Sequence, residues 1–260
     1  MKQKIYQLLI ELTNGKRSSS ILQQVTKSKW SGKLIPSYIR TYGIDLKEVA
    51  NSVESFETLH DFFIRQLDVQ YRPVAEGNDV VISPVDAKIE SMGSISTNGT
   101  FCVKEKTYTL SELLGNNEYA SLYEDGMYVV FYLSPADYHR IHSPVDGHIK
   151  KQYVLGLKSY PVNRMGLTYG KEPISGNYRH VSHLVCQNTK KCAVVKVGAM
   201  FVNSIELTNQ ARDWKKGDEI GYFTFGSTVV LLFEKDSFIF DDHIKPNVRV
   251  RVGEKIGNMV

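Results

Sequence analysis

The positions of apolar side chains divide the chain into two parts. Near the start they recur at helical spacing, as in Ile5, Leu8 and Leu12 and again in the stretch FETLHDFFIRQL. Further on, short runs of β-branched and aromatic residues alternate with Gly, Pro, Asn and Asp, which is typical of strands joined by turns. We therefore predict an α+β protein, with a helical region over residues 1–75 and a mainly β body over residues 76–260.

Four apolar runs are the clearest strand candidates in the body. They are Asp79–Ser83, Met127–Leu133, Val194–Val197 and Val229–Phe233. A single turn of helix is expected at Thr109–Leu114. No long helical pattern intervenes between these runs, so the body is expected to be built from β-sheets.

One short motif occurs twice. The segment SPVDAKIE at 83–90 resembles SPVDGHIK at 143–150, where a turn again leads into an apolar strand. Two copies of a turn and strand predict two similar hairpin units that close a barrel or a sandwich. The same pattern is similar to that of lipoyl-type domains, so we expect a lipoyl-like, barrel-sandwich duplication.

Composition narrows the class of protein. With 42% hydrophobic and 23% charged residues, the 260-residue chain has the balance of a globular protein. A spanning helix needs about 20 apolar residues, and the longest apolar run, Met127–Leu133, is far shorter, so no transmembrane segment is expected. Gln7 and Glu11 interrupt the apolar start, which argues against a secretory signal. Three cysteines favour a reducing compartment over a disulfide framework.

Charge is concentrated at the start of the chain. Residues 1–44 hold eight Lys and Arg against Glu11 alone, a net charge of +7, whereas the whole chain carries only +4. A basic segment that also carries Trp30, Tyr38 and Tyr42 suits the headgroup region of an anionic membrane. The alternative is that the apolar stripes simply pack on the body. No helix-turn-helix or basic-aromatic repeat is present, so we expect no nucleic acid partner.

Three residues that lie far apart in the sequence could together carry out a reaction: Asp86, His142 and Ser227. Gly226-Ser227-Thr228 opens an apolar strand, Asp86 lies in the first Pro-Val-Asp turn, and His142 precedes the second. A carboxylate can orient an imidazole, and the imidazole can take a proton from a hydroxyl. This order would also suit a serine hydrolase, but the chain has no G-x-S-x-G elbow.

Each of these residues also has a purely structural explanation. Gly226 and Ser227 could form a β-bulge. Asp86, like its counterpart Asp146 in the second copy of the motif, could hold its own turn. His139 or His142 could be a structural hydrogen-bonding histidine.

A zinc site is a further alternative, which we disfavour. His139 and His142 are three residues apart, and His180 and His183 repeat this spacing. Neither HExxH nor His-x-His occurs in the chain, so we predict no metal.

Longer blocks carry a resemblance to a known family. They are SPVD at 83–86, SPADYHRIHSPVDG at 134–147, VGAMFVNSIEL at 197–207 and KKGDEIGYFTFGSTVVLLF at 215–233. In this order, and from FETLHDFFIRQL onward, the chain resembles the bacterial, pyruvoyl-dependent phosphatidylserine decarboxylases. It departs from the family pattern at Ala87, Asn203 and Phe225, and Gly176-Asn177-Tyr178-Arg179 matches only in part.

The resemblance implies a self-cleaving enzyme. Ser227 would attack the carbonyl of Gly226, with His142 as the base and Asp86 orienting it. Cleavage between 226 and 227 would leave a covalently bound pyruvate, the pyruvoyl group, at the former Ser227. This carbonyl would form a Schiff base with phosphatidylserine and release phosphatidylethanolamine. His139 is a candidate proton donor or carboxylate contact, and Thr228 a candidate donor to the oxyanion.

The resemblance also implies partners and a location. Fragments 1–226 and 227–260 would remain together as a heterodimer, whose further assembly the sequence leaves open. The enzyme would bind the cytoplasmic face of the cell membrane peripherally. Two rival hypotheses stay open: a serine hydrolase that is not cleaved, and a non-enzymatic carrier or lipid-binding module.

Overall fold

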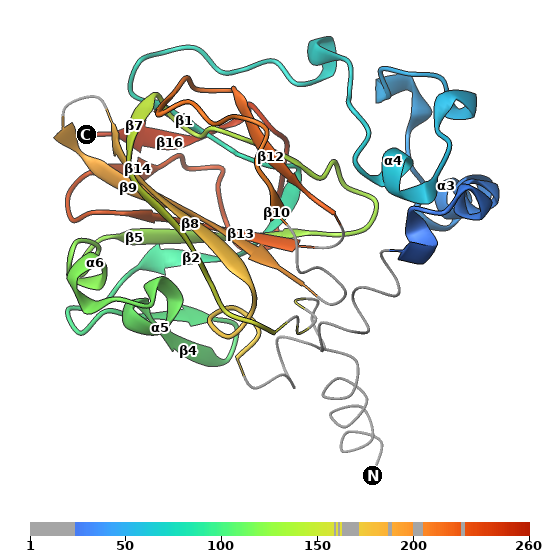
Figure 1. Ribbon diagram of the computed structural model, residues 1–260. Coiled ribbons are helices and arrows are strands. Elements are labelled where there is room, and N and C mark those ends of the chain that lie inside the picture. The colour runs from blue at the N-terminus through green and yellow to red at the C-terminus, as the bar shows by residue number, and fades with distance from the viewer. Residues whose placement is uncertain are drawn as a thin grey trace.

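A large antiparallel sheet forms the centre of the molecule (Figure 1). The computed structural model describes residues 24–158, 160, 162, 172–186, 189–199, 205–224 and 227–260. The strands of the sheet follow the order β11 (Asp213–Trp214), β7 (Gly147–Leu155), β8 (Arg179–Cys186), β9 (Lys191–Gly198), β13 (Ser227–Phe233), β5 (Met127–Leu133), β2 (Ala87–Ser94) and β15 (Arg249–Val250).

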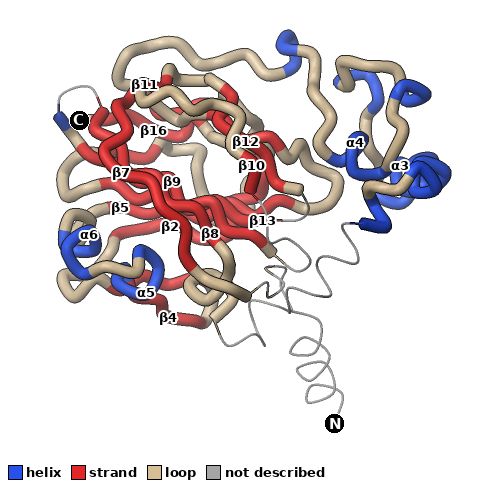
Figure 2. The backbone as a smooth tube through the Cα atoms, viewed as in Figure 1, coloured by secondary structure: helices blue, strands red, loops and turns tan. Residues whose placement is uncertain are grey.

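Further layers cover both faces of this sheet (Figure 2). One face packs against two small sheets, β1 (Val80–Ile82), β16 (Lys255–Met259) and β14 (Phe238–Phe240), and β10 (Ile205–Glu206), β12 (Glu219–Phe223) and β6 (Arg140–His142). The other face packs against the hairpin β3 (Thr100–Val103) and β4 (Lys106–Thr109) and helices α5 (Leu110–Leu114) and α6 (Asn117–Ser121). We call the buried cluster on the first face the inner core and the buried cluster on the other face the outer core.

Strand β13 shows how the sequence produces this layering. Its side chains alternate between the faces, so that Val229 and Leu231 join the inner core, whereas Val230 and Leu232 join the outer core. A strand buried on both faces is expected to be apolar at every position rather than at alternate ones. The four predicted strands and the helical turn at Thr109–Leu114 are confirmed, as β1, β5, β9, β13 and α5.

The described part of the N-terminal region consists of short helices joined by loops. They are η1 (Lys29–Leu34), α3 (Ile35–Tyr42), η2 (Leu46–Glu48), η3 (Val53–Ser55), α4 (Leu59–Phe63) and η4 (Val69–Tyr71). Ile35, Leu59 and Phe62 form a small core of their own. The helical stripe predicted around residues 5–12 lies outside the described residues. None of the described helices is long and apolar enough to cross a membrane.

Of the expectations for the β body, a closed barrel is not found among the described strands, and the lipoyl-like duplication is not confirmed. The central sheet ends at the two-residue strands β11 and β15, so the described strands do not close into a barrel. The repeated turns are real: Ser83 Oγ and Ser143 Oγ each donate to the carbonyl two residues on, at 2.7 Å. They also contact each other, because the His142 N–H donates to Pro84 O at 2.8 Å. Beyond these turns, the described residues do not establish a lipoyl-like duplication.

Candidate active site

Ser227 is the first residue of β13 and is fully buried. It lies opposite Leu133 of β5 on one side and Gly198 of β9 on the other. Its Oγ has no hydrogen-bond partner among the residues that the structure describes. Leaving a buried hydroxyl unpaired costs about 1–3 kcal/mol, so an orphan hydroxyl at this point suggests a chemical role. Gly226, the other half of the predicted cleavage site, lies outside the described residues.

A backbone carbonyl orients His142, the last residue of β6. His142 Nδ1 lies 2.8 Å from Gly217 O. A carbonyl can only accept, so Nδ1 carries the hydrogen and Nε2 is left with the lone pair. Gly217 has a φ of 87°, in the left-handed region that favours glycine, and this turn directs its carbonyl at the imidazole. The Tyr138 hydroxyl lies 3.3 Å from His142 Nε2.

Burial favours the neutral form of His142. Desolvation lowers its pKa, although the bond to Gly217 and the nearby carboxylates of Glu219 and Asp86 act in the opposite direction. An imidazole that is neutral, with Nε2 free of hydrogen, is the form that can accept a proton from a hydroxyl.

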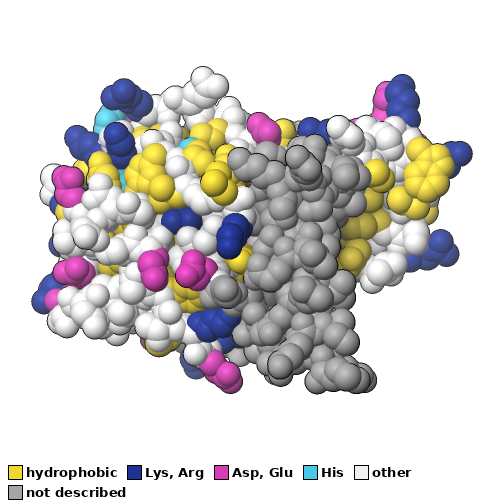
Figure 3. Space-filling model, turned by 60° about the horizontal axis from the view of Figure 1, so that its bottom comes forward, with side chains coloured by type: hydrophobic (Ala, Val, Ile, Leu, Met, Phe, Trp, Pro, Cys, Tyr) yellow, Lys and Arg dark blue, Asp and Glu magenta, His cyan; other side chains and the backbone are white. Residues whose placement is uncertain are grey.

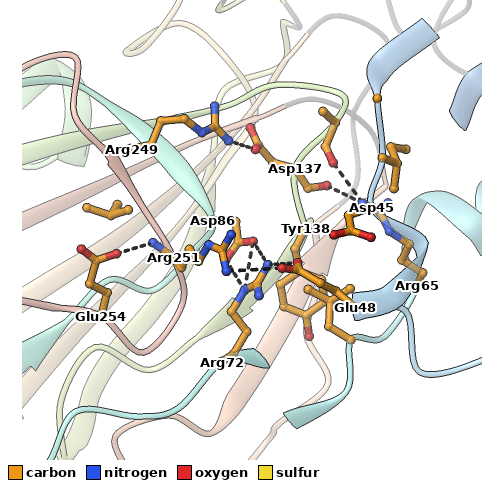
Figure 4. Close-up of a pocket in the computed structure, with 15 residues that line it drawn as sticks. Asp45, Glu48, Arg65, Arg72, Asp86, Asp137, Tyr138, Arg249, Arg251 and Glu254 are labelled. Carbon is orange, nitrogen blue, oxygen red and sulfur yellow. Dashed lines mark hydrogen bonds and ion pairs between the residues drawn. The ribbon is translucent and has the colours of Figure 1, made fainter. Parts of the chain in front are cut away.

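Asp86 is held by an arginine rather than by His142 (Figure 4). Arg72 donates from Nε to Asp86 Oδ1 at 2.9 Å and from Nη2 to Oδ2 at 2.5 Å. The Val252 N–H donates to Oδ1 at 2.8 Å. Arg72 also donates to Glu48 Oε2 at 2.8 Å. Asp86 and His142 therefore interact only through space in this structure.

His139 is hydrogen-bonded to the residue that follows the strand partner of Ser227. Its ring is fully buried and stacks on Phe63 with 4.0 Å between the ring centroids. Nε2 donates to Ser134 O at 3.0 Å, and Ser134 directly follows Leu133, the strand partner of Ser227. Nδ1 consequently bears a lone pair, and no described residue hydrogen-bonds to it.

Two further features distinguish His139. Burial lowers its pKa to about 3, with the charge of Arg65 acting in the same direction, so the ring stays neutral over the physiological range. Its loop is fixed by Asp137, which accepts from the Ser134 N–H at 2.6 Å and from Ser134 Oγ at 2.8 Å.

Thr228 is separated from the other candidates. Successive residues of a strand point to opposite faces, so its side chain lies on the outer-core side, away from that of Ser227. A contact of Thr228 with the oxyanion that would form on the Gly226 carbonyl would have to come from its backbone N–H.

A polar cavity of about 380 Å³ borders the Asp86 side of this region (Figure 4). Asp86 and Tyr138 line it, but His142 and Ser227 do not. Among the described residues, then, no hydrogen bond joins Asp86, His142 and Ser227. Tyr138 alone belongs to the cavity and also contacts His142.

The zinc alternative gains no support. The described residues contain no group of three or more His, Cys, Asp or Glu side chains that could hold a metal ion. His180 and His183 both lie in β8, three residues apart, and so point to opposite faces of the sheet. His183 is instead bound by the hydroxyls of Tyr123 and Tyr153, at 2.8 and 3.0 Å.

Comparison with known proteins shows the family of the chain. The family model for phosphatidylserine decarboxylase matches residues 59–258. The chain belongs to the phosphatidylserine decarboxylase family. The predicted enzyme class, a carboxy-lyase, is thereby confirmed at the level of the family.

Similar curated proteins cover almost the whole chain. A phosphatidylserine decarboxylase proenzyme of Geobacillus sp. (strain WCH70) is 52% identical over 253 residues, 97% of each chain. The proenzyme of Anoxybacillus flavithermus (strain DSM 21510 / WK1) is 51% identical, over 97% of this chain and 95% of its own. That of Bacillus mycoides (strain KBAB4) is 45% identical over 260 residues, 100% of this chain and 99% of its own.

Sequence reasoning missed the groups that surround the predicted residues. Arg72 lies 14 residues from Asp86, and Gly217 acts on His142 through a carbonyl that has no sequence signature. Tyr138 could have been noticed, because it lies four residues before His142 in the family block SPADYHRIHSPVDG.

Proposed function

We propose that the chain decarboxylates phosphatidylserine to phosphatidylethanolamine by means of a pyruvoyl group made from Ser227. The observation that carries the proposal is the buried, unpartnered Ser227 Oγ at the start of β13, directly after Gly226. The family supplies the substrate class, and the relatives named as proenzymes are consistent with self-processing.

The surroundings of Ser227 fit a pyruvoyl group. A hydroxyl with no hydrogen-bond partner is free to react and to be lost. Strand β13 pairs over seven residues with β5 and over seven with β9. A new chain terminus at residue 227 would therefore stay anchored on both sides after cleavage.

Self-processing follows from the chain's own groups. Ser227 Oγ loses its proton to a base and attacks the carbonyl carbon of Gly226, which converts the amide into an ester. Removal of the Cα proton of residue 227 then expels the Gly226 carboxylate and leaves dehydroalanine. Addition of water to dehydroalanine gives the keto group and releases ammonia.

We assign the base to His142 and a supporting charge to Asp86. Nε2 of His142 has the lone pair, and the Gly217 carbonyl would stabilise the imidazolium that forms. Asp86 does not touch the ring, but its negative charge also favours the imidazolium. In this proposal Arg72 keeps the Asp86 carboxylate in place.

For the decarboxylation itself, the pyruvoyl carbonyl would supply the electron sink for a substrate that carries a primary amine. His139 is the protein group proposed to act nearby. Its neutral ring has a free Nδ1 and lies beside the loop that follows Leu133. It is suited to contact the serine headgroup or to pass a proton within a site that excludes water.

The N-terminal region is proposed to bring the site to the membrane. Trp30 is 62% exposed, and Leu34 and Tyr42 are about 40% exposed. Figure 3 shows apolar side chains beside Lys and Arg in the part of the molecule that carries α3 and α4. Aromatic rings and cations together suit an anionic lipid surface. We infer peripheral attachment to the cytoplasmic face of the cell membrane.

A Ser227→Ala variant tests the processing step. We expect it to remain a single chain of 260 residues without decarboxylase activity, whereas the unchanged protein yields fragments 1–226 and 227–260. The neighbouring Thr228→Ala variant should still be cut, because its side chain faces the other core. Cleavage of the Ser227→Ala variant at the same bond would refute the assigned nucleophile. An uncut but active wild-type protein would favour the hydrolase hypothesis.

A further inference from the structure

Strand β9 carries a buried lysine for which the proposed mechanism has no use. Lys196 has no exposed surface. Its Nζ donates to Ser182 Oγ at 2.7 Å and lies 5.3 Å from the centre of the Trp214 ring. No carboxylate of the described residues forms an ion pair with it. An uncompensated buried ammonium is costly, so its presence suggests that the amine has a role.

The chemical state of this amine is unusual for a lysine. Desolvation lowers the pKa of Lys196 to about 7, so a large fraction of the side chain is neutral near neutral pH. His180 lies opposite Lys196 in β8, and burial lowers the pKa of His180 to about 3, so it adds no charge. A desolvated, neutral lysine is the form that condenses with carbonyl groups.

Strand register places Lys196 next to Ser227. In the β13–β9 pair, Ser227 lies opposite Gly198, and Val229 lies opposite Lys196. Ser227 and Lys196 therefore point to the same face, that of the inner core, as diagonal neighbours. The Cα atoms of such diagonal neighbours are roughly 7–8 Å apart, a distance that a long side chain can span. Gly198 has no side chain to fill the space between them.

We propose that Lys196 is a catalytic residue that forms an internal imine with the keto carbon of residue 227 after self-processing. The side chain would turn from Ser182 towards Gly198. A C=N bond forms between Nζ and the keto carbon, and the keto oxygen leaves as water with the two amine hydrogens. The imine joins the two fragments covalently. The primary amine of the substrate then replaces Nζ on the same carbon, and Lys196 returns as the free amine.

This inference rests on the proposed function, but the two can fail separately. Borohydride reduces an imine to a stable secondary amine. When processed protein is treated with borohydride in the absence of lipid, we expect fragments 1–226 and 227–260 to become cross-linked. The product should run as one full-length band on a denaturing gel, with a peptide that links Lys196 to residue 227 in mass spectra.

Other outcomes of this treatment are equally clear. If the fragments stay separate and the shorter one gains only the two hydrogens of a reduced ketone, the pyruvoyl group exists and the inference is wrong. If the untreated protein is not cut and contains no keto group, the proposed function is wrong, and the inference, which needs that keto carbon, is overturned with it.

Matched variants identify the amine. Lys196→Met has a similar volume and removes the buried charge, and Lys196→Arg retains a cation that forms no imine; we expect both to be cut but not cross-linked. Lys191→Met is the control on the same strand, since Lys191 is 41% exposed and pairs with Glu234; it should cross-link like the unchanged protein. Cross-linking that persists in either Lys196 variant would overturn the assignment.

Discussion

At the scale of single residues, the orientation of His142 depends on a backbone carbonyl. Gly217 O fixes the hydrogen on Nδ1, and burial favours the neutral ring. The arrangement resembles the one in which a carboxylate orients a catalytic histidine, but the acceptor here is uncharged. Because the carbonyl carries no proton, its role does not change with pH. The pH dependence of proton transfer to Nε2 should therefore report on His142 itself.

Self-processing should persist to lower pH than it would if its base had the usual pKa of a histidine. The folded-state pKa of His142 is lowered, so the base form persists below pH 6.5, the usual value, and is lost only as the pH falls through the lowered pKa. The rate of cleavage of freshly translated chain, followed on gels from pH 5 to 8, should have its midpoint below the usual histidine value of about 6.5.

Two results would contradict this assignment. One is a midpoint above the usual histidine value. The other is unchanged cleavage in a His142→Ala variant, since loss of a general base is expected to slow the reaction by roughly 10²–10⁴-fold.

The sequence offered candidates for the reacting residues but not for the groups that hold them. Ser227, His142 and Asp86 could be chosen because each lies in a block that matches the family. The bond from Arg72 to Asp86 could not be predicted, since it joins the N-terminal region to the body through side chains alone. The free Nδ1 of His139 was also hidden, because it follows from how one loop folds back on Ser134.

At the scale of elements, an ion pair connects the N-terminal region to the turn that carries Asp86. Arg72 follows η4, and Asp86 precedes β2; both side chains are 9% exposed. Glu48 at the end of η2 binds the same guanidinium. These contacts fix the short helices against the body at the point where Asp86 is needed.

Removal of Arg72 should therefore be strongly destabilising. An Arg72→Met change leaves the carboxylate of Asp86 buried without its cation, and breaking a buried pair in this way costs about 3–5 kcal/mol. Arg251→Met is the control, because Arg251 also pairs with Glu48 but is 63% exposed. Its loss should cost less than about 1 kcal/mol. Urea unfolding of both variants in the uncut Ser227→Ala background measures the difference, and equal losses would contradict the coupling.

Elements were predictable where local chemistry determines them. The capping box of α5, in which Thr109 and Glu112 each accept from the other's backbone N–H, lies within the predicted helical turn. The strands β5 and β13 could be read from continuous apolar runs, which indicate burial on both faces. The open ends of the sheet could not be predicted from the sequence. They are the two-residue strands β11 and β15, which pair with β7 and β2.

At the scale of the whole molecule, charge and exposed apolar side chains are concentrated at the start of the chain. Each Lys or Arg near an anionic surface contributes about 1 kcal/mol, and salt screens this attraction. Binding of the protein to vesicles that contain phosphatidylserine should therefore weaken as salt rises from 0.05 to about 0.5 M. Sedimentation with these vesicles and with uncharged ones measures the effect.

Point variants separate charge from apolar contact. Trp30→Ala should weaken binding at every salt concentration, whereas Lys33→Gln should reduce the dependence on salt. Binding that is equally strong to uncharged vesicles and insensitive to salt would contradict an electrostatic contribution.

The most direct test of the whole account is the intact mass of the purified, active protein under denaturing conditions. The account predicts two chains, residues 1–226 and residues 227–260, with a keto group in place of the amino terminus of the shorter one. The two should elute together under native conditions, because β13 is paired along its whole length. An active preparation that consists of one continuous chain with an unmodified Ser227 would contradict the account.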